Sequence, residues 1–182
     1  MTRQTDTQKE AVWKAYWDHK PTRVPVRWNT NVRIILLNPA LNPEGYTFER
    51  YFKDPVVTMT IQARHQEYCA SVLSRVCDNS SRIPDKWSCG VDTLNTYDGA
   101  YFGAPVIYDS GQVPSNVSFM TEADVDDFLR RDFSRPLDNP WVREKLALRE
   151  EMVKAAVDFR YNGRKADVRR FEVGFDGPVT IG

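Results

Sequence analysis

The predicted fold depends most on one stretch, residues 141–178, which reads WVREKLALREEMVKAAVDFRYNGRKADVRRFEVGFDGP. Its first part repeats apolar residues at helical spacing up to Phe159, so it predicts one long helix. Asn162 and Gly163 then end this helix in the manner of a C-cap. Residues 167–175 follow as a strand, with Asp176 at its exit. A helix that leads directly into a strand is the connection that parallel sheets need, so the stretch indicates an α/β protein.

Further helices and strands alternate in the same way along the rest of the chain. Asp54 and Pro55 supply the N-cap and first turn of a helix predicted over residues 55–76. Helices are also predicted over residues 6–18 and from a capping box at Thr121 and Asp124 to Arg130, and strands over residues 21–28, 32–37, 87–97 and 104–108. We expect residues 24–28, 87–94 and 168–173 to form parallel strands of one sheet, with the two longest helices packed outside it.

Composition and charge exclude several classes of protein. Of the 182 residues, 41% are hydrophobic and 27% are charged, which excludes disordered and fibrous architectures. The 25 Lys and Arg residues balance the 25 Asp and Glu residues, which argues against nucleic acid or an anionic membrane as a partner. The longest apolar run, residues 34–37, is far shorter than the roughly 20 residues that span a bilayer. Residues 1–6 also lack a signal-peptide core, so we expect a soluble, cytoplasmic protein.

The cysteines and histidines do not form a recognisable metal or catalytic motif. Cys69, Cys77 and Cys89 are too widely spaced for a C-x-x-C pair and are interpreted as reduced thiols. His19 and His65 are the two histidines, and no zinc site or His-based triad can be assembled from the local sequence. His65 lies on the apolar face of its predicted helix, where a hydrogen-bonded core histidine is the commoner outcome. We therefore expect neither a metal site nor a cofactor within this chain.

Three motifs, in their order and spacing, resemble a known family. They are RVPV at residues 23–26, AYFGAPV at residues 100–106 and GFDGPVT at residues 174–180, of which the last is the most specific. The sequence resembles the N-terminal half of the uroporphyrinogen decarboxylase superfamily, whose members are TIM barrels. The resemblance implies a partial (β/α)8 barrel, since a complete barrel has at least 200 residues. It implies one domain over residues 1–182, truncated at its C-terminus, with a helical extension at residues 1–20. We also expect an open sheet edge that favours association.

This resemblance implies one of two activities. Decarboxylases of the superfamily remove acetate carboxyl groups from a tetrapyrrole without a cofactor, while corrinoid-linked methyltransferases use zinc. The zinc ligands of the second branch lie in the C-terminal half, so zinc is not expected in this chain. The implied substrate is a tetrapyrrole, a corrinoid or a methylated small molecule, and the implied partners are a corrinoid protein or a second copy of the chain. The adjacent pair Gly177 and Pro178 resembles the methyltransferase branch.

Residues at the carboxyl ends of the predicted strands form the candidate site, because catalytic groups of a parallel barrel gather there. The candidates are Asp92 and Asn95 as catalytic residues, and Arg33, Asn29, Asn31 and Asp176 as substrate-binding residues. The decarboxylases have an Arg-Gln-Ala-Gly-Arg run, for one arginine of which Arg33 stands in here. Their aspartate falls at the position of Leu94, and Asp92 and Asn95 lie nearby. Arg33 would hold a substrate carboxylate, and Asp92 would orient a cationic or N–H group of the ligand.

Each candidate also has a structural interpretation. Asparagine is common in turns, so Asn29 and Asn31 can be turn residues. Aspartate is common at helix N-termini, so Asp176 can be a helix cap. Asp92 follows the apolar Val91, and a carboxylate in such surroundings must be paired or functional. At the level of the whole chain, the alternative to an enzyme domain is a non-catalytic remnant that serves as a binding or assembly module.

Overall fold

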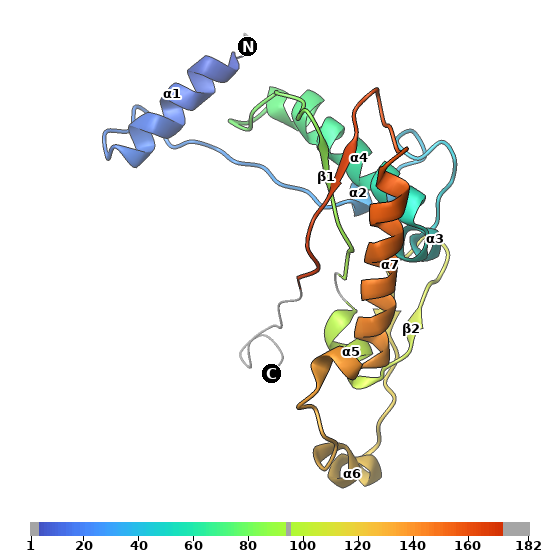
Figure 1. The fold of residues 1–182 in the computed structure, drawn as a ribbon. Coiled ribbons are helices and arrows are strands. Elements are labelled where there is room, and N and C mark those ends of the chain that lie inside the picture. Colours follow the sequence, from blue (N-terminus) through green and yellow to red (C-terminus); the bar gives the residue numbers. More distant parts are fainter. Residues whose placement is uncertain (1–3, 94–95, 173–182) are drawn as a thin grey trace.

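The computed structural model describes residues 4–93 and 96–172. In this part of the chain, helices pack against a short pair of parallel strands (Figure 1). The helices are α1 (Asp6–Trp17), α2 (Arg33–Leu36), α3 (Phe48–Lys53), α4 (Pro55–Ser71), α5 (Tyr97–Phe102), α6 (Val125–Leu129) and α7 (Pro140–Ala156), with short 3-10 turns at Leu73–Arg75, Glu122–Asp124 and Pro136–Asp138. The strands are β1 (Trp87–Cys89), β2 (Val106–Ile107), β3 (Ser115–Asn116) and β4 (Ala166–Val168). This part of the chain holds one parallel pair and one antiparallel hairpin, so the partial barrel remains a prediction.

The parallel pair of β1 and β4 lies beside α4 and α7 (Figure 1). Trp87 is paired with Ala166, and its side chain is fully buried among residues of both helices. The indole N–H of Trp87 donates to the carbonyl of Tyr161 at 2.8 Å, which satisfies the one polar group of the ring. The parallel pairing of these two strands is confirmed, and α7 supplies the helical crossover that ends at β4.

The two long helices begin where the sequence predicts. Asp54 accepts hydrogen bonds from the first backbone N–H groups of α4, which has Pro55 as its first residue. Asn139 caps α7 in the same way, and Pro140 follows it. The predicted helix over residues 55–76 ends earlier, at Ser71, and continues as a separate 3-10 turn. Local capping chemistry therefore fixes the starts of both helices.

Two glutamines of α4 close the edge of β1 that faces away from β4. The side-chain amide of Gln62 donates to the Gly90 carbonyl at 2.7 Å and accepts from the Gly90 N–H at 2.8 Å. Gln66, one helical turn later, makes the same two bonds with Ser88 at 3.0 and 3.1 Å. The two amides thus imitate a neighbouring strand, which protects this edge from further pairing. Within the described residues, no third strand joins the other edge at β4.

Two predicted strands are wrong. Residues 24–28 form no strand and bond a loop instead: the Val26 N–H donates to the Asp78 carboxylate at 2.7 Å, the Val26 carbonyl accepts from the Asp78 N–H at 2.7 Å, and the Trp28 N–H donates to the Asn79 amide at 3.1 Å. Residues 33–36 form α2 instead of a strand, and the side chains of Ile35 and Leu36 pack into a core with α3 and α4. Tertiary contacts thus override the β propensity of both segments.

The remaining strands are shorter than predicted. The segment over residues 87–97 is a strand only as far as Cys89, and α5 begins at its far end. Residues 104–108 contribute β2, which pairs antiparallel with β3. Of the strand predicted over residues 167–175, only residues 167 and 168 are strand, as part of β4 (Ala166–Val168). Residues 169–172 are not in a strand, and residues 173–175 lie outside the described residues. The capping box at Thr121 and Asp124 is confirmed.

Helix α1 stands apart from α7 and docks on the loop that follows the 3-10 turn at Leu73–Arg75 (Figure 1). The Lys9 ammonium is buried and donates to the carbonyls of Ser74 and Asn79, the second at 2.8 Å. The Trp13 indole donates to the Asp78 carbonyl at 2.9 Å. The Asp78 carboxylate in turn pairs with the guanidinium of Arg23. The described part of the N-terminal extension, residues 4–20, is therefore held by specific hydrogen bonds to the loop.

We expect residues 23–26 to loosen from this loop as the pH falls below about 4. Arg23 lowers the pKa of Asp78, so the stabilisation is present above the pKa of an unfolded aspartate and is lost as the pH falls through the folded value. The measurement is the NMR shift of the Val26 backbone N–H, which donates to the Asp78 carboxylate, between about pH 6 and pH 3. Asp78→Asn should give the low-pH shift already at about pH 6, whereas Asp18→Asn, in an exposed ion pair, should not. An unchanged Val26 shift in Asp78→Asn would contradict the role of this carboxylate.

Candidate functional site

The candidate site is a cavity of about 500 Å³ beyond the carboxyl ends of β1 and β4. Its polar lining includes Asn31, Tyr51, Gln62, His65, Asp92 and Arg169. These residues come from the loop before α2, from α3 and α4, and from the segments that leave the two strands. Ligand sites of parallel sheets lie at this end of the strands, because the loops that follow the strands converge there.

Asp92 is held in the cavity by a chain of hydrogen bonds. The hydroxyl of Tyr51 donates to the Asp92 carboxylate at 2.7 Å and accepts from the Gln62 amide at 3.0 Å. Tyr51 is fully buried, and burial together with the charge of Asp92 raises its pKa well above the usual value. The phenol therefore stays protonated and acts as a donor to the carboxylate. A carboxylate fixed in this way can accept a hydrogen bond from a cationic or N–H group of a ligand.

Arg169 supplies the positive charge of the cavity. It follows β4 directly, and its backbone N–H donates to the Cys89 carbonyl at 2.8 Å. Its guanidinium lies over Gly90, where an added Cβ would come within 3.3 Å of two of its nitrogens. The side chain is exposed and forms no ion pair with another residue of the described ranges. Its guanidinium fork has the shape that binds a carboxylate in a bidentate manner.

His65 forms another wall of the cavity. Its Nε2 atom lies 3.1 Å from the hydroxyl of Thr30, and its ring is half-buried. Burial lowers the pKa of His65, so the imidazole is neutral at pH 7. The histidine is hydrogen-bonded, as predicted from its apolar helix face, and it also contacts the cavity.

The structure brings together part of the predicted site. Asp92 and Asn31 line the same cavity, and the Asn31 side chain also accepts a hydrogen bond from the backbone of Arg33 at 3.0 Å. Arg33 and Asn29 are not among the lining residues. The other two candidates, Asn95 and Asp176, lie outside the described residues.

Four residues that line the cavity were not predicted from the sequence as site residues: Arg169, Tyr51, Gln62 and His65. Arg169 was placed inside a strand over residues 167–175, whereas β4 ends one residue before it. Tyr51 and Gln62 lie on apolar helix faces, where the sequence shows only core packing. The one available signal was Gln62 itself, since a buried amide must find partners.

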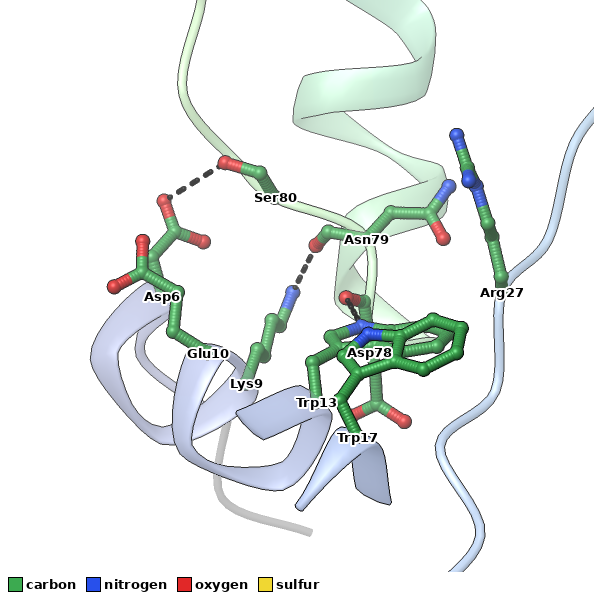
Figure 2. A pocket seen from close by; sticks show the side chains of 9 residues that line it. All are labelled: Asp6, Lys9, Glu10, Trp13, Trp17, Arg27, Asp78, Asn79 and Ser80. Atoms are coloured by element: carbon green, nitrogen blue, oxygen red, sulfur yellow. Dashed lines mark hydrogen bonds between the residues drawn. The ribbon is translucent and has the colours of Figure 1, made fainter. Parts of the chain in front are cut away.

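A second cavity, of about 360 Å³, lies between α1 and the loop that it contacts (Figure 2). The indoles of Trp13 and Trp17 stack in it with ring centroids 6.3 Å apart. One ammonium and two carboxylates that line this cavity already contact other residues of the chain. Lys9 donates to the Asn79 carbonyl, Asp78 pairs with Arg23, and Asp6 accepts from the Ser81 N–H at 2.8 Å. These groups hold α1 in place, so the cavity at the strand ends is the better candidate.

Within residues 4–93 and 96–172, no group of three or more His, Cys, Asp or Glu side chains is arranged to hold a metal ion. No helix in these ranges combines the length and the apolar character needed to cross a bilayer.

Comparisons of the chain with family models, curated proteins and solved structures each returned no match.

Proposed function

We propose that this chain is a cytoplasmic enzyme domain of the uroporphyrinogen decarboxylase kind, which binds a carboxylate-bearing small molecule in the cavity at the strand ends. The observation that carries the proposal is the meeting of Asp92 and Asn31 with Arg169 in that cavity. Asp92 and Asn31 were both selected from the sequence, and Asp92 follows β1, whereas the strand predicted before Asn31 is not formed. Their presence in one cavity beside a cation is the arrangement that such a substrate requires.

In this proposal the two charged residues divide the work of binding. Arg169 holds a substrate carboxylate, and its position over Gly90 keeps the guanidinium at the strand end. Asp92, supported by the Tyr51 hydroxyl, accepts a hydrogen bond from an N–H group such as that of a pyrrole. Opposite charges at two points of one cavity fix the orientation of a ligand as well as its affinity.

Two reactions remain as proposals for this site. Decarboxylation of a tetrapyrrole acetate group uses the cation and the carboxylate as described. Corrinoid-linked methyl transfer would use the same cavity to hold a methylated small molecule or a corrinoid. The tetrapyrrole and the corrinoid each present polar groups around an extended ring. Binding of the two ring systems can be measured separately.

The proposal is tested by the binding of two probes to the full chain. Uroporphyrin represents the carboxylated tetrapyrrole, hydroxocobalamin represents the corrinoid, and quenching of tryptophan fluorescence reports binding. We expect one probe to bind and Asp92→Asn to weaken that binding by about 10-fold or more, because a hydrogen bond to a charged group contributes about 1.5 to 3 kcal/mol. Asp158→Asn, an exposed carboxylate beyond the end of α7, is the matched control.

The outcomes separate the alternatives. Uroporphyrin binding that depends on Asp92 supports the decarboxylase branch, and cobalamin binding that depends on Asp92 supports the methyltransferase branch. If neither probe binds, or if Asp92→Asn and Asp158→Asn bind equally well, the proposal is overturned.

A further inference from the structure

The cavity of about 360 Å³ between α1 and the loop that it contacts has the features of a separate ligand site (Figure 2). We call it the α1 cavity, and its lining includes the indoles of Trp13 and Trp17 and the side chain of Arg27. Its volume is near the lower end of the range of about 300 to 1,000 Å³ that small-molecule sites occupy. The α1 cavity therefore suits a ligand of one or two rings better than a tetrapyrrole.

The two indoles form an aromatic wall that is fixed in place and yet open to solvent. The indole N–H of Trp13 donates to the Asp78 carbonyl at 2.9 Å, which holds this ring against the loop. Trp17 stacks on Trp13 with planes inclined by 21°, and Tyr16 contacts Trp17 edge-on with ring centroids 5.1 Å apart. Trp17 nevertheless remains 68% exposed. An exposed ring that its neighbours already hold in place is a surface on which a planar ligand can stack.

The carboxylates of the α1 cavity already have cationic partners. These carboxylates are Asp6, Glu10 and Asp78. The Arg82 guanidinium lies 2.9 Å from the Glu10 carboxylate and 3.9 Å from that of Asp6, and Arg23 pairs with Asp78. A cationic ligand would therefore have to displace an existing partner in order to reach a carboxylate.

Arg27 is the cation of this lining that remains available to a ligand. The Lys9 ammonium is buried and donates to carbonyls of the loop. Arg27 comes from the extended segment that passes beside the indoles, and its side chain is exposed (Figure 2). Within the described part of the chain, no carboxylate forms an ion pair with Arg27. The α1 cavity thus combines an open aromatic wall with one cation that can bind an anionic group.

We propose that the α1 cavity binds a small planar aromatic molecule that carries one anionic group, a carboxylate or a phosphate. The ring stacks on the Trp17 indole, and the anionic group accepts charge-assisted hydrogen bonds from the Arg27 guanidinium. Indoles also attract cations such as quaternary ammonium groups, but Arg27 would repel a ligand of that kind. The ring and the charge of the ligand are both required, because each contacts a different side of the cavity.

A bound ligand would join two segments that are each held to the loop. Trp17 belongs to α1, which the Trp13 indole connects to Asp78, and Arg27 follows Val26, whose N–H donates to the same aspartate. Contacts of one ligand with both segments add to these hydrogen bonds. Binding should therefore slow the hydrogen exchange of the Trp13 indole N–H, because a ligand that binds the docked state stabilises it.

An NMR titration of the full chain tests the proposal with two aromatic anions, indole-3-acetate for the carboxylate and adenosine monophosphate for the phosphate. We expect one of them to shift the indole N–H signals of Trp13 and Trp17 until the site is saturated, while the signal of the buried Trp87 stays in place. Indole and adenosine keep the ring without the charge, and acetate and inorganic phosphate keep the charge without the ring. Each should bind at least about 10-fold more weakly than the aromatic anion, because it lacks either the charge-assisted hydrogen bonds or the stacking.

Variants separate the two contacts. Arg27→Gln should weaken binding of the aromatic anion by about 10-fold or more and leave the affinity for the uncharged ring unchanged. Its matched control is Arg75→Gln, at an exposed arginine of the 3-10 turn that does not line the cavity. Trp17→Ala should weaken binding of both the anion and the uncharged ring, whereas Trp28→Ala, also exposed but outside the lining, should weaken neither. An unchanged thermal melt shows that Trp17→Ala folds, and Arg27→Gln decides the outcome if it does not.

Three results would overturn the proposal: neither aromatic anion binds, the uncharged rings bind as tightly as the anions, or Arg27→Gln and Arg75→Gln bind alike. The α1 cavity does not depend on the proposed function, since Asp92 lines the other cavity. Asp92→Asn should therefore bind the aromatic anion like the parent chain, and Arg27→Gln should bind uroporphyrin like the parent chain. The two sites thus fail in different experiments.

Discussion

Replacing Gln62 with leucine is expected to lower the free energy of unfolding by about 2 to 4 kcal/mol. Leucine has nearly the same size, so the core is not opened, but the Gly90 N–H and carbonyl lose their partners. Gln62 and Gly90 are both buried, so water cannot replace the lost hydrogen bonds. Each buried backbone group left without a partner costs about 1 to 3 kcal/mol. Urea denaturation followed by circular dichroism measures the loss.

Gln66→Leu is the matched control for this prediction. Gln66 makes the same pair of hydrogen bonds with Ser88, but Ser88 is exposed and water can take the place of the amide. We expect a loss of less than about 1 kcal/mol. Equal losses in the two variants would show that burial of the strand edge does not determine how much each amide contributes to the free energy of unfolding. The interpretation of Gln62 as an edge partner would then be wrong.

The sequence was most informative where structure is decided locally. Asp54 with Pro55 predicted the start of α4, because a cap acts on backbone groups two or three residues away, and the structure adds Asn139 as the corresponding cap of α7. Caps of this kind require no knowledge of distant residues. The parallel arrangement of β1 and β4 was predicted on a different basis, the rule that parallel strands are joined by a helical crossover.

Strand limits were less predictable because distant side chains set them. The amides of Gln62 and Gln66 pair with β1 along one edge, and the Asp78 and Asn79 side chains replace a strand as partners of residues 24–28. Neither pairing leaves a periodic signal, since the partners are single polar residues on a helix or a loop. A different reason explains why α2 was mistaken for a strand: its apolar residues are buried on more than one side, so they show no helical period.

The candidate site likewise contains residues that sequence patterns reveal and residues that they do not. Asp92 was found because a polar residue after an apolar strand is a visible pattern; Asn31 was selected after a predicted strand that does not form, yet both line the cavity. The cation was assigned to Arg33, whereas the cavity contains Arg169. Locating Arg169 requires the end of β4 to within one residue, and strand ends are the least reliable part of a prediction from sequence.

We expect Arg169→Ala to weaken uroporphyrin binding by about 10- to 100-fold, because the guanidinium makes charge-assisted hydrogen bonds to a carboxylate. The dissociation constant is measured by quenching of tryptophan fluorescence. Arg170→Ala removes a neighbouring exposed charge without altering the cavity and should leave the affinity nearly unchanged. Arg33→Ala tests the residue that the sequence favoured, and a loss at Arg33 with none at Arg169 would reverse the assignment.

Gly90→Ala gives an independent test of where the guanidinium lies. The new Cβ would approach the Nε and Nη2 atoms of Arg169 to 3.3 Å, so the guanidinium must shift by a few tenths of an ångström while its charge is retained. We expect a loss of affinity between those of Arg170→Ala and Arg169→Ala, because a bidentate hydrogen bond depends on geometry as well as charge. Combined with Arg169→Ala, the Gly90 substitution should have no further effect on affinity, since the group that it displaces is gone. Additive losses in the double variant would mean that Gly90 acts on the ligand by another route.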